Sequence, residues 1–284
     1  MLLTSLPPTT RKLSTPAAGA SPGLSDSRVN LAGGLVPRLF AAGTHLLVSL
    51  TVAACVMAVV YLGWYPAPLD AISGVGDVLL LLLAVDVTLG PVLTAIVFDR
   101  RKKSLPFDLA CIAVLQVGAL AYGLHAVEAG RPHYLVFVKD RFEVVSHADL
   151  QKEDRLAAAS NRAADADWFS PRIVAAQMPT DEQERKDLLF ESVQGGRDVQ
   201  HFPKRYRDYA TQAAPAAGKA LPLQVLRDLN PDRTARLQDA VERSAVPESE
   251  LRFLPIKGPK GDAAMLIRAG SGAIVSMIDL VPWR

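Results

Sequence analysis

The sequence has few cysteines and no stretch in which basic residues alternate with aromatic ones. Only Cys55 and Cys111 occur among 284 residues, and both lie in apolar segments. A disulfide framework is therefore excluded, and without a CxxC pair neither thiol exchange nor a cysteine zinc site is expected. The net charge of +2 forms no single-sign stripe, so the electrostatic footprint of a nucleic-acid-binding protein is missing.

Charge is also scarce between Leu39 and Val127, where nearly all of the uncharged length of the chain is found. Three apolar runs occur there, at about 39–62, 78–98 and 109–127. A hydrocarbon core of about 30 Å needs roughly 20 helical residues, which each run supplies. Buried helices of soluble proteins are seldom apolar all round at this length. The sequence thus predicts an integral membrane protein with three transmembrane helices.

The loops between these runs predict the orientation. Four basic residues, Arg100, Arg101, Lys102 and Lys103, lie between the second and third runs, whereas the first connection, residues 63–76, has no Lys or Arg. The positive-inside rule makes the basic loop a topology signal that places it, and hence the amino terminus, in the cytoplasm. Residues 128–284 are then outside. Trp64 and Tyr65 are expected where the first helix meets the outer membrane interface.

Residues 1–38 are rich in Ser, Thr, Pro, Gly and Ala and have few large apolar side chains. Such a segment cannot bury enough surface to fold, so we predict a disordered cytoplasmic tail. A signal peptide is the alternative, but the first apolar run is too long for one. The sequence Leu-Gly-Trp-Tyr-Pro that follows Tyr61 also suits cleavage poorly.

The remainder, residues 128–284, has the pattern of a soluble α+β domain. Strands are expected at 134–138, 141–145 and 172–176, helices at 181–193 and 223–244, and a terminal hairpin at 263–268 and 273–280. The first of these helices has a capping residue at Thr180 or Asp181. About 150 residues suffice for a core of their own.

Catalytic and ligand-binding motifs are absent from this pattern. The histidines, at positions 45, 125, 133, 147 and 201, form no HExxH and no i, i+4 pair. Ser271 sits in the expected hairpin turn and not in a nucleophile elbow. The segment Gly258-Pro259-Lys260-Gly261 lacks the spacing of a phosphate-binding loop. We predict no catalytic residue, no cofactor and no metal, and hence no enzyme.

One acidic residue, Asp86, lies near the middle of the second apolar run. Insertion scales give about 2.5–3.5 kcal/mol for such a residue, which therefore faces a bundle interior, a cavity or a partner. At a rise of about 1.5 Å per residue it lies roughly 18 Å from Phe98, a depth that Ser49 and Thr51 share on the first helix. Gln116 on the third helix lies one turn nearer the cytoplasm. These four residues form a candidate polar cluster, which either holds its own bundle together or contacts a partner or ion.

Gly90 and Pro91 follow one turn after Asp86. Proline removes a backbone hydrogen bond and kinks a helix. The kink serves either helix packing or a binding groove, and the sequence leaves both interpretations open.

Between about Arg38 and Trp283 the sequence resembles the type IV pilin accessory proteins of the TfpX/TfpZ kind. The matching segments, in chain order, are Trp64-Tyr65-Pro66, Pro68-Leu69, Val85-Asp86, Leu89-Gly90-Pro91, Thr94, Lys102-Lys103-Ser104-Leu105, Asp108, Gln116, Tyr122-Gly123, Arg131-Pro132, Val136-Phe137, Asp140-Arg141-Phe142, Gln200-His201-Phe202-Pro203, Leu254-Pro255 and Pro282-Trp283. The resemblance implies a multi-pass protein of the bacterial inner membrane with a periplasmic domain. It further implies chaperone-like help in producing or assembling a cognate type IV major pilin, through protein contacts. The competing interpretation is a membrane-anchored periplasmic ligand sensor, which requires a pocket with convergent polar groups.

Overall fold

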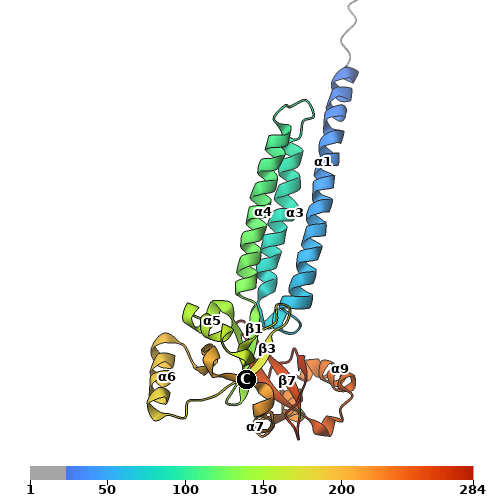
Figure 1. The fold of residues 1–284 in the computed structure, drawn as a ribbon. Coiled ribbons are helices and arrows are strands. Elements are labelled where there is room, and N and C mark those ends of the chain that lie inside the picture. The colour runs from blue at the N-terminus through green and yellow to red at the C-terminus, as the bar shows by residue number, and fades with distance from the viewer. Residues whose placement is uncertain (1–23, 284) are drawn as a thin grey trace, which may run out of the picture.

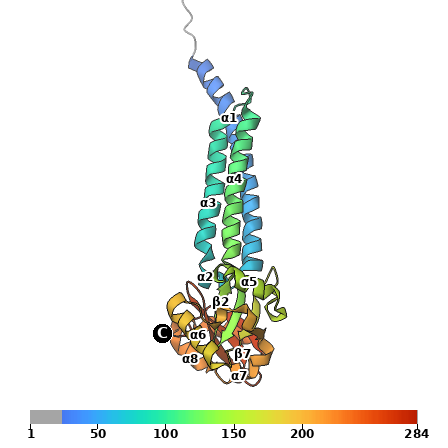
Figure 2. The same ribbon diagram turned by 60° about the vertical axis from the view of Figure 1, so that its left-hand side comes forward.

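The computed structural model describes residues 24–283. Three long helices stand side by side on a compact soluble domain, and the carboxy terminus lies in that domain (Figure 1, Figure 2). The predicted fold class, three membrane helices followed by an α+β domain, is confirmed.

The helices are long and apolar enough to cross a membrane over Gly34–Trp64, Val75–Val97 and Leu105–Ala129. The first segment combines α1 (Leu24–Val59) with a turn of π-helix (Val60–Trp64), and the others are α3 (Val75–Val97) and α4 (Leu105–Ala129). Each span begins three to five residues earlier than the apolar runs suggested.

Helix α1 also starts earlier than expected, because residues 24–38 were assigned to a disordered tail. Their backbone is helical from Leu24 onward. Once the apolar span supplies the costly helix nucleus, adding residues to its end is favourable even where composition is poor in large apolar side chains. The rest of the predicted tail, residues 1–23, lies outside the described residues.

The three spans form an open row. Helix α1 packs along α3, and α4 packs along the other flank of α3, whereas within the described residues α1 and α4 make few direct contacts. Most side chains of the spans are consequently exposed on the protein surface, which suits contact with lipid. The row leaves a longitudinal opening between α1 and α4 over one face of α3.

At the domain end the row is closed by the connection between the first two spans. Helix α2 (Leu69–Ser73) buries Leu69 and Ile72 in the core of the soluble domain. The backbone N–H of Lys260 in that domain donates to the Ile72 carbonyl at 2.9 Å. We call this region, residues 60–76 with the adjoining ends of α3 and α4, the foot of the bundle.

Trp64 and Tyr65 lie in the foot, at the end of the first span as expected, and both rings are buried there. They pack with Val60, Val75 and Val127, among others, in one cluster. The Tyr65 hydroxyl donates to the Val127 carbonyl at 2.8 Å, which ties the first span to the third. Burial of the Tyr65 ring is possible because hydrogen bonding satisfies its hydroxyl, whereas the buried Trp64 Nε1 has no hydrogen-bond partner among the described residues.

The soluble domain is built on one mixed sheet with strand order β4-β3-β1-β2-β6-β7-β8, and β5 pairs with β6. The strands are β1 (Pro132–Val138), β2 (Arg141–Ser146), β3 (Arg172–Ala176), β4 (Tyr206–Asp208), β5 (Leu221–Pro222), β6 (Leu251–Lys257), β7 (Asp262–Arg268) and β8 (Ile274–Ile278). The helices are α5 (Lys152–Ala159), α6 (Glu182–Gly195), α7 (Ala213–Ala217), α8 (Leu223–Leu229) and α9 (Thr234–Ser244), joined by short 3-10 turns.

Strand β1 is buried along its whole length because both faces of the sheet are covered. Leu135 and Phe137 point into the cluster that also holds Leu69 of the foot, and Tyr134, Val136 and Val138 point into a second cluster on the opposite face. This alternation follows from the period of two in a β-strand. A membrane-proximal segment thus shares the central core of the domain.

The predicted strands at 134–138, 141–145 and 172–176 and the terminal hairpin are confirmed. Helix α6 is capped as expected, since the Asp181 carboxylate accepts from the Glu184 N–H at 2.9 Å. The helix expected at 223–244 was wrong as a single element. It is interrupted at Asn230-Pro231, because proline disfavours helical backbone in the residue before it.

Candidate intramembrane site

A pocket of about 190 Å³ opens between the three spans at the level of Asp86. We call it the intramembrane groove and define it by the residues that line it: His45, Val48, Ser49, Val52, Ala53, Leu83, Asp86, Ala113, Gln116, Val117 and Leu120. Its walls are mostly apolar, with four polar side chains among them. Such a lining suits a largely apolar occupant that also offers a hydrogen-bonding group.

Helical spacing explains why polar groups meet here. Asp86, Gly90 and Thr94 recur every four residues on α3 and so lie on one face of that helix. His45 and Ser49 have the same spacing on α1. Three helices therefore present their polar stripes to one another along the open side of α3.

Hydrogen bonds join these helix faces. Gln116 Nε2 donates to the backbone carbonyl of Asp86 at 3.1 Å, and His45 Nδ1 lies 2.7 Å from Thr94 Oγ1. Among the described residues, no hydrogen bond or ion pair reaches the Asp86 carboxylate itself. It is half-buried and faces the groove. The strongest polar group of the site is thus available to an occupant.

Gly90 permits the close approach of all three helices. A Cβ atom at this position would overlap Gln116 Nε2 and would lie 2.8 Å from His45 Nε2. Any larger residue would push the α1 and α4 side chains off α3. Glycine here lets the ends of the Gln116 and His45 side chains rest directly on α3, and Pro91 beside it is half-buried within a helix that continues to Val97.

The structure brings together most of the predicted cluster, namely Asp86, Ser49, Gln116 and Gly90. Thr51 does not line the groove, and its hydroxyl donates to the Leu47 carbonyl of its own helix at 2.8 Å. Residues two apart on a helix point in different directions, so Ser49 and Thr51 could not both face α3.

Sequence reasoning missed His45 and Thr94. Their signal was present in the four-residue steps from Ser49 back to His45 and from Gly90 on to Thr94. Thr94 is buried, as expected for a residue on the α3 face that packs against α1.

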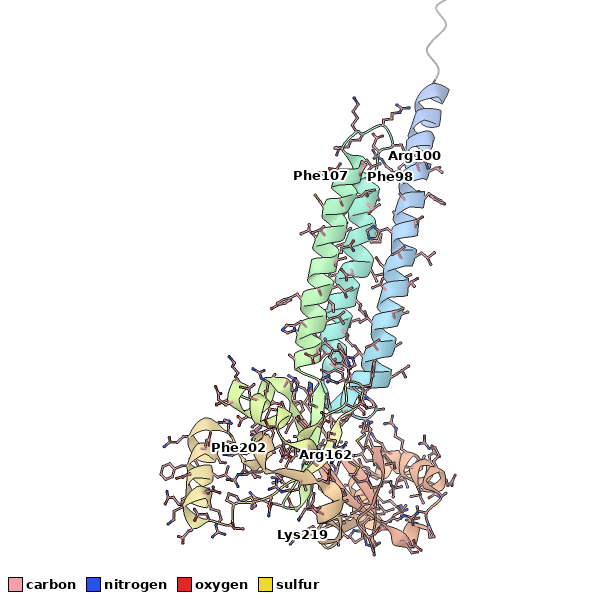
Figure 3. All side chains as sticks on the ribbon, viewed as in Figure 1. Phe98, Arg100, Phe107, Arg162, Phe202 and Lys219 are labelled. Atoms are coloured by element: carbon pink, nitrogen blue, oxygen red, sulfur yellow. The ribbon has the colours of Figure 1, made fainter. Side chains whose placement is uncertain are left out.

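The basic loop lies at the end of the bundle farthest from the soluble domain, where Figure 3 labels Phe98, Arg100 and Phe107. Arg100, Arg101, Lys102 and Lys103 are all exposed. Lys102 pairs with Asp108 at 2.6 Å, and Arg38 of α1 donates to the Phe98 carbonyl at 2.9 Å. A depression of about 650 Å³ lies between this loop and α1, lined by Arg38, Phe98 and Arg100 among others.

A second polar cluster, which the sequence did not reveal, lies beside the foot. Ligand atoms of Glu128, His133 and His147 all fall within 4.8 Å of one another. Pairing of β1 with β2 brings residues 133 and 147 together. Their spacing in the sequence does not predict this contact. This donor set suits zinc by residue type.

The geometry of the second cluster argues against a metal. The His133 and His147 rings stack almost parallel, with centroids 3.3 Å apart, so their in-plane lone pairs do not converge. Arg131 Nε lies 3.1 Å from His133 Nε2 and 3.5 Å from Glu128 Oε1, where a cation would bind. Burial, followed by the charges of His147 and Arg131, lowers the pKa of His133 to about 3. Arg131 itself serves as the cation of this cluster.

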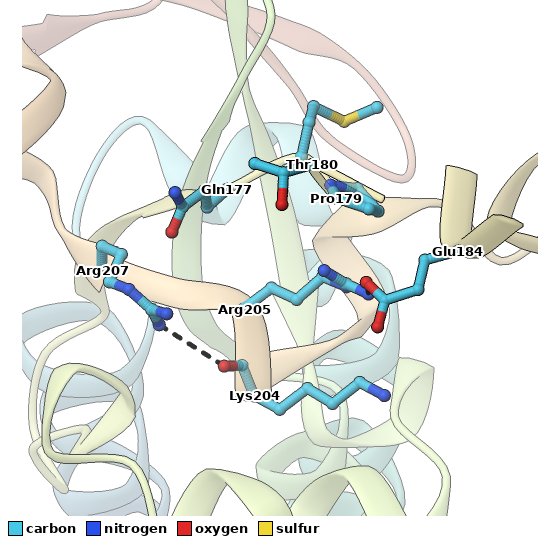
Figure 4. Close-up of a pocket in the computed structure, with 8 residues that line it drawn as sticks. Gln177, Pro179, Thr180, Glu184, Lys204, Arg205 and Arg207 are labelled. Carbon is cyan, nitrogen blue, oxygen red and sulfur yellow. Dashed lines mark hydrogen bonds and ion pairs between the residues drawn. The ribbon is translucent and has the colours of Figure 1, made fainter. Parts of the chain in front are cut away.

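A third depression, of about 340 Å³, opens on the soluble domain between the start of α6 and the segment that leads into β4 (Figure 4). Three of its four charged side chains already bind one another or the backbone, and among the described residues the Lys204 ammonium has no ion pair or hydrogen bond. Arg205 pairs with Glu184 at 2.9 Å, and Arg207 donates to the Lys204 carbonyl. Lys204 is then the one charged side chain of this depression left unengaged among the described residues, which falls short of the several convergent polar groups that a ligand sensor requires.

Comparison with known proteins identifies the family. Residues 34–74, which include the whole first span and most of the connection that follows it, match the family described as fimbrial assembly protein FimB. The fimbrial assembly protein of serogroup I from Dichelobacter nodosus is 29% identical over 248 residues, which cover 85% of this chain and 96% of that protein. The corresponding protein of serogroups C1 and C2 is 36% identical over 117 residues, 39% of this chain and 89% of that protein. No solved structure matches. By these similarities to named relatives, the chain belongs to the fimbrial assembly protein family.

Proposed function

We propose that this protein resides in the bacterial inner membrane and assists assembly of a cognate type IV pilin by binding its membrane helix in the intramembrane groove. The family and the names of its relatives support a role in fimbrial assembly. The resemblance to pilin accessory proteins points to the same subunit class. The protein acts through protein contacts, and the groove contributes no chemistry of its own.

The observation that carries this proposal is the open row of helices. Because α1 and α4 both pack on α3 and hardly on each other, a groove lined by side chains of all three spans lies open between them, where a further apolar helix can contact all three. A pilin awaiting assembly offers one apolar helix in the membrane and a globular head outside it. Packing and interhelical hydrogen bonds drive helix association in lipid, and both the apolar walls and the free Asp86 carboxylate supply them.

The soluble domain would then lie on the same side of the membrane as the pilin head. Strand β8 (Ile274–Ile278) ends the sheet, next to β7. An edge strand offers a row of backbone donors and acceptors to a partner. We therefore place a second, weaker pilin contact at this edge.

The proposed orientation rests on the exposed basic loop opposite the soluble domain. Alkaline phosphatase fused after Val127 should be active and after Lys103 inactive, because only the former position is periplasmic. The reverse pattern would overturn the orientation. Removing the positive charges of Arg100, Arg101, Lys102 and Lys103 together should reduce correct insertion.

The groove itself can be tested by filling it. Val117 lines the groove, whereas Leu115 is comparably exposed, at 70% against 66%, but points away from it. Val117→Trp should lower surface fimbriae while the protein remains at normal abundance, and Leu115→Trp should leave fimbriae unchanged. Normal fimbriae with Val117→Trp would contradict the proposal.

A further inference from the structure

The segment between α5 and β3 carries two large aromatic side chains that are more than half exposed. The exposed fractions of Trp168 and Phe169 are 53% and 58%. Large aromatic side chains exposed together on a soluble domain indicate a surface that is covered by a binding partner or by lipid, because leaving such side chains in water is unfavourable. Their surroundings indicate which of the two it is.

Both rings lie against the last turn of the first span. The Trp168 ring meets Trp64 edge to face, with centroids 5.6 Å apart. Phe169 Cδ1 lies only 3.0 Å from the position that a Cβ on Gly63 would take, so glycine makes room for it. Gly63 and Trp64 belong to the first span, and the neighbouring Leu62 is 83% exposed towards the lipid. Phe169 thus lies at the depth where the span leaves the membrane.

The segment is held at this depth by Arg131, whose side chain is buried. Its guanidinium donates to the Trp168 carbonyl and lies 5.2 Å from the centroid of the Trp168 ring. Glu128, at the end of α4, forms an ion pair with Arg131, with 3.5 Å between Glu128 Oε1 and Arg131 Nε. The aromatic pair is thereby fixed to the ends of both the first and the third span.

We propose that Trp168 and Phe169 insert into the bilayer interface and hold the soluble domain on the membrane surface. Aromatic rings favour this zone, where apolar faces meet the acyl boundary and polar edges meet headgroups. The segment contains Asp165 and Asp167 against one basic residue, Arg162, all three exposed, so attraction to anionic lipid is not the driving force. The occupant is the neutral interface of a phospholipid bilayer, continuous with the lipid around the first span.

Helix α6 provides a matched control. Its residues Leu189, Phe190 and Val193 are also exposed, and the exposed fraction of Phe190 is 67%. Figure 1 shows α6 away from the ends of the spans, on the outer flank of the domain. The same residue type therefore occurs, similarly exposed, at the membrane and far from it.

The test uses the full chain with Cys55 and Cys111 replaced by alanine, in phosphatidylcholine vesicles. Spin labels are attached at Phe169→Cys or Phe190→Cys, and their relaxation by dissolved oxygen and by a water-soluble nickel chelate is compared. We expect the label at 169 to gain oxygen relaxation and lose nickel relaxation, and the label at 190 to show the reverse. Equal nickel relaxation at the two positions would overturn the proposal. Protection of position 169 in native membranes but not in vesicles would also overturn it, because the occupant would then be a protein.

A second experiment uses tryptophan fluorescence and needs no spin label. The variant Trp64→Phe with Trp283→Phe leaves Trp168 as the sole tryptophan. Brominated phosphatidylcholine should quench its emission, and adding phosphatidylglycerol should not increase that quenching. Emission that brominated lipid leaves unchanged, or quenching that requires phosphatidylglycerol, would contradict insertion into a neutral interface.

Discussion

The two ends of the membrane bundle differ in how they are held together. At the foot, Leu69 and Ile72 enter the core of the soluble domain, and the Tyr65 hydroxyl joins the first span to the third. Farther from the domain, the helices meet mainly through α3, and the groove opens between α1 and α4. The end beside the soluble domain is held by a water-excluded core, whereas no such core joins α1 and α4 at the level of Asp86, near the middle of α3.

This difference has a physical cause. In lipid, apolar side chains gain little by leaving the membrane for a helix interface, so packing and a few hydrogen bonds hold spans together. A core next to water has the hydrophobic effect as well. Anchoring three spans in such a core fixes their spacing and allows the groove to stay open without a partner helix.

The largest effect is expected from loosening the foot. Leu69→Ala removes a fully buried side chain, and such changes cost about 2–5 kcal/mol. Leu62→Ala, only seven residues away, changes a side chain that faces lipid and should alter stability by less than about 0.5 kcal/mol. Denaturant unfolding of the detergent-purified proteins measures both. Equal losses would show that the foot is no more tightly held than the lipid-facing surface.

Closing the groove from inside should have the next largest effect. Gly90→Ala places a methyl group against the ends of the Gln116 and His45 side chains, which must move aside, and overpacking of this kind costs up to about 3 kcal/mol. Gly118→Ala on α4 is the control, since no atom lies within 4 Å of its added methyl group. Thermal unfolding should separate the two variants. A Gly90→Ala protein as stable as Gly118→Ala would mean that the helices approach each other less closely.

The junction beside the foot should respond to pH. Burial lowers the pKa of His133 to about 3, so the unfolded chain takes up a proton first as pH falls. Stability is therefore complete above about pH 6.5 and is lost progressively towards pH 3, by about 1 kcal/mol per pH unit. His133→Gln should flatten this dependence between pH 7 and 5. An unchanged slope would assign the acid sensitivity to other groups.

Inside the groove the expected effects on stability are smallest. Gln116→Leu removes the bond to the Asp86 carbonyl, and intramembrane hydrogen bonds average about 0.6 kcal/mol. Asp86→Asn and Asp86→Leu should both be nearly silent, because the carboxylate has no partner among the described residues. Unfolding measurements on the three variants decide this. A large loss for Asp86→Leu alone would assign the carboxylate a structural role within the bundle.

Local pattern predicted the parts of this fold that depend on local causes. The three spans follow from uninterrupted apolar length, and the start of α6 from the capping carboxylate of Asp181. The burial of Leu69 and Ile72 could not be foreseen, because residues 63–76 have the prolines and glycines of a loop. Their core position depends on strands more than 60 residues later in the chain.

The same distinction applies to the candidate sites. Asp86, Gly90 and Gln116 stood out because a polar or flexible residue is unusual within an apolar run. His133 and His147 did not, since strand pairing and not sequence spacing brings them together. Residues that meet through tertiary contacts leave no periodic trace in the sequence.

The central claim is that the groove receives the membrane helix of a fimbrial subunit, and photo-cross-linking in fimbriated cells tests it most directly. A photoreactive amino acid at Val117 should capture a fimbrial subunit, and the same amino acid at Leu115 should not, although both positions are similarly exposed. Introducing Asp86→Leu should weaken capture from position 117 without changing protein abundance. Capture of no subunit from position 117, or equal capture from both positions, would contradict the account.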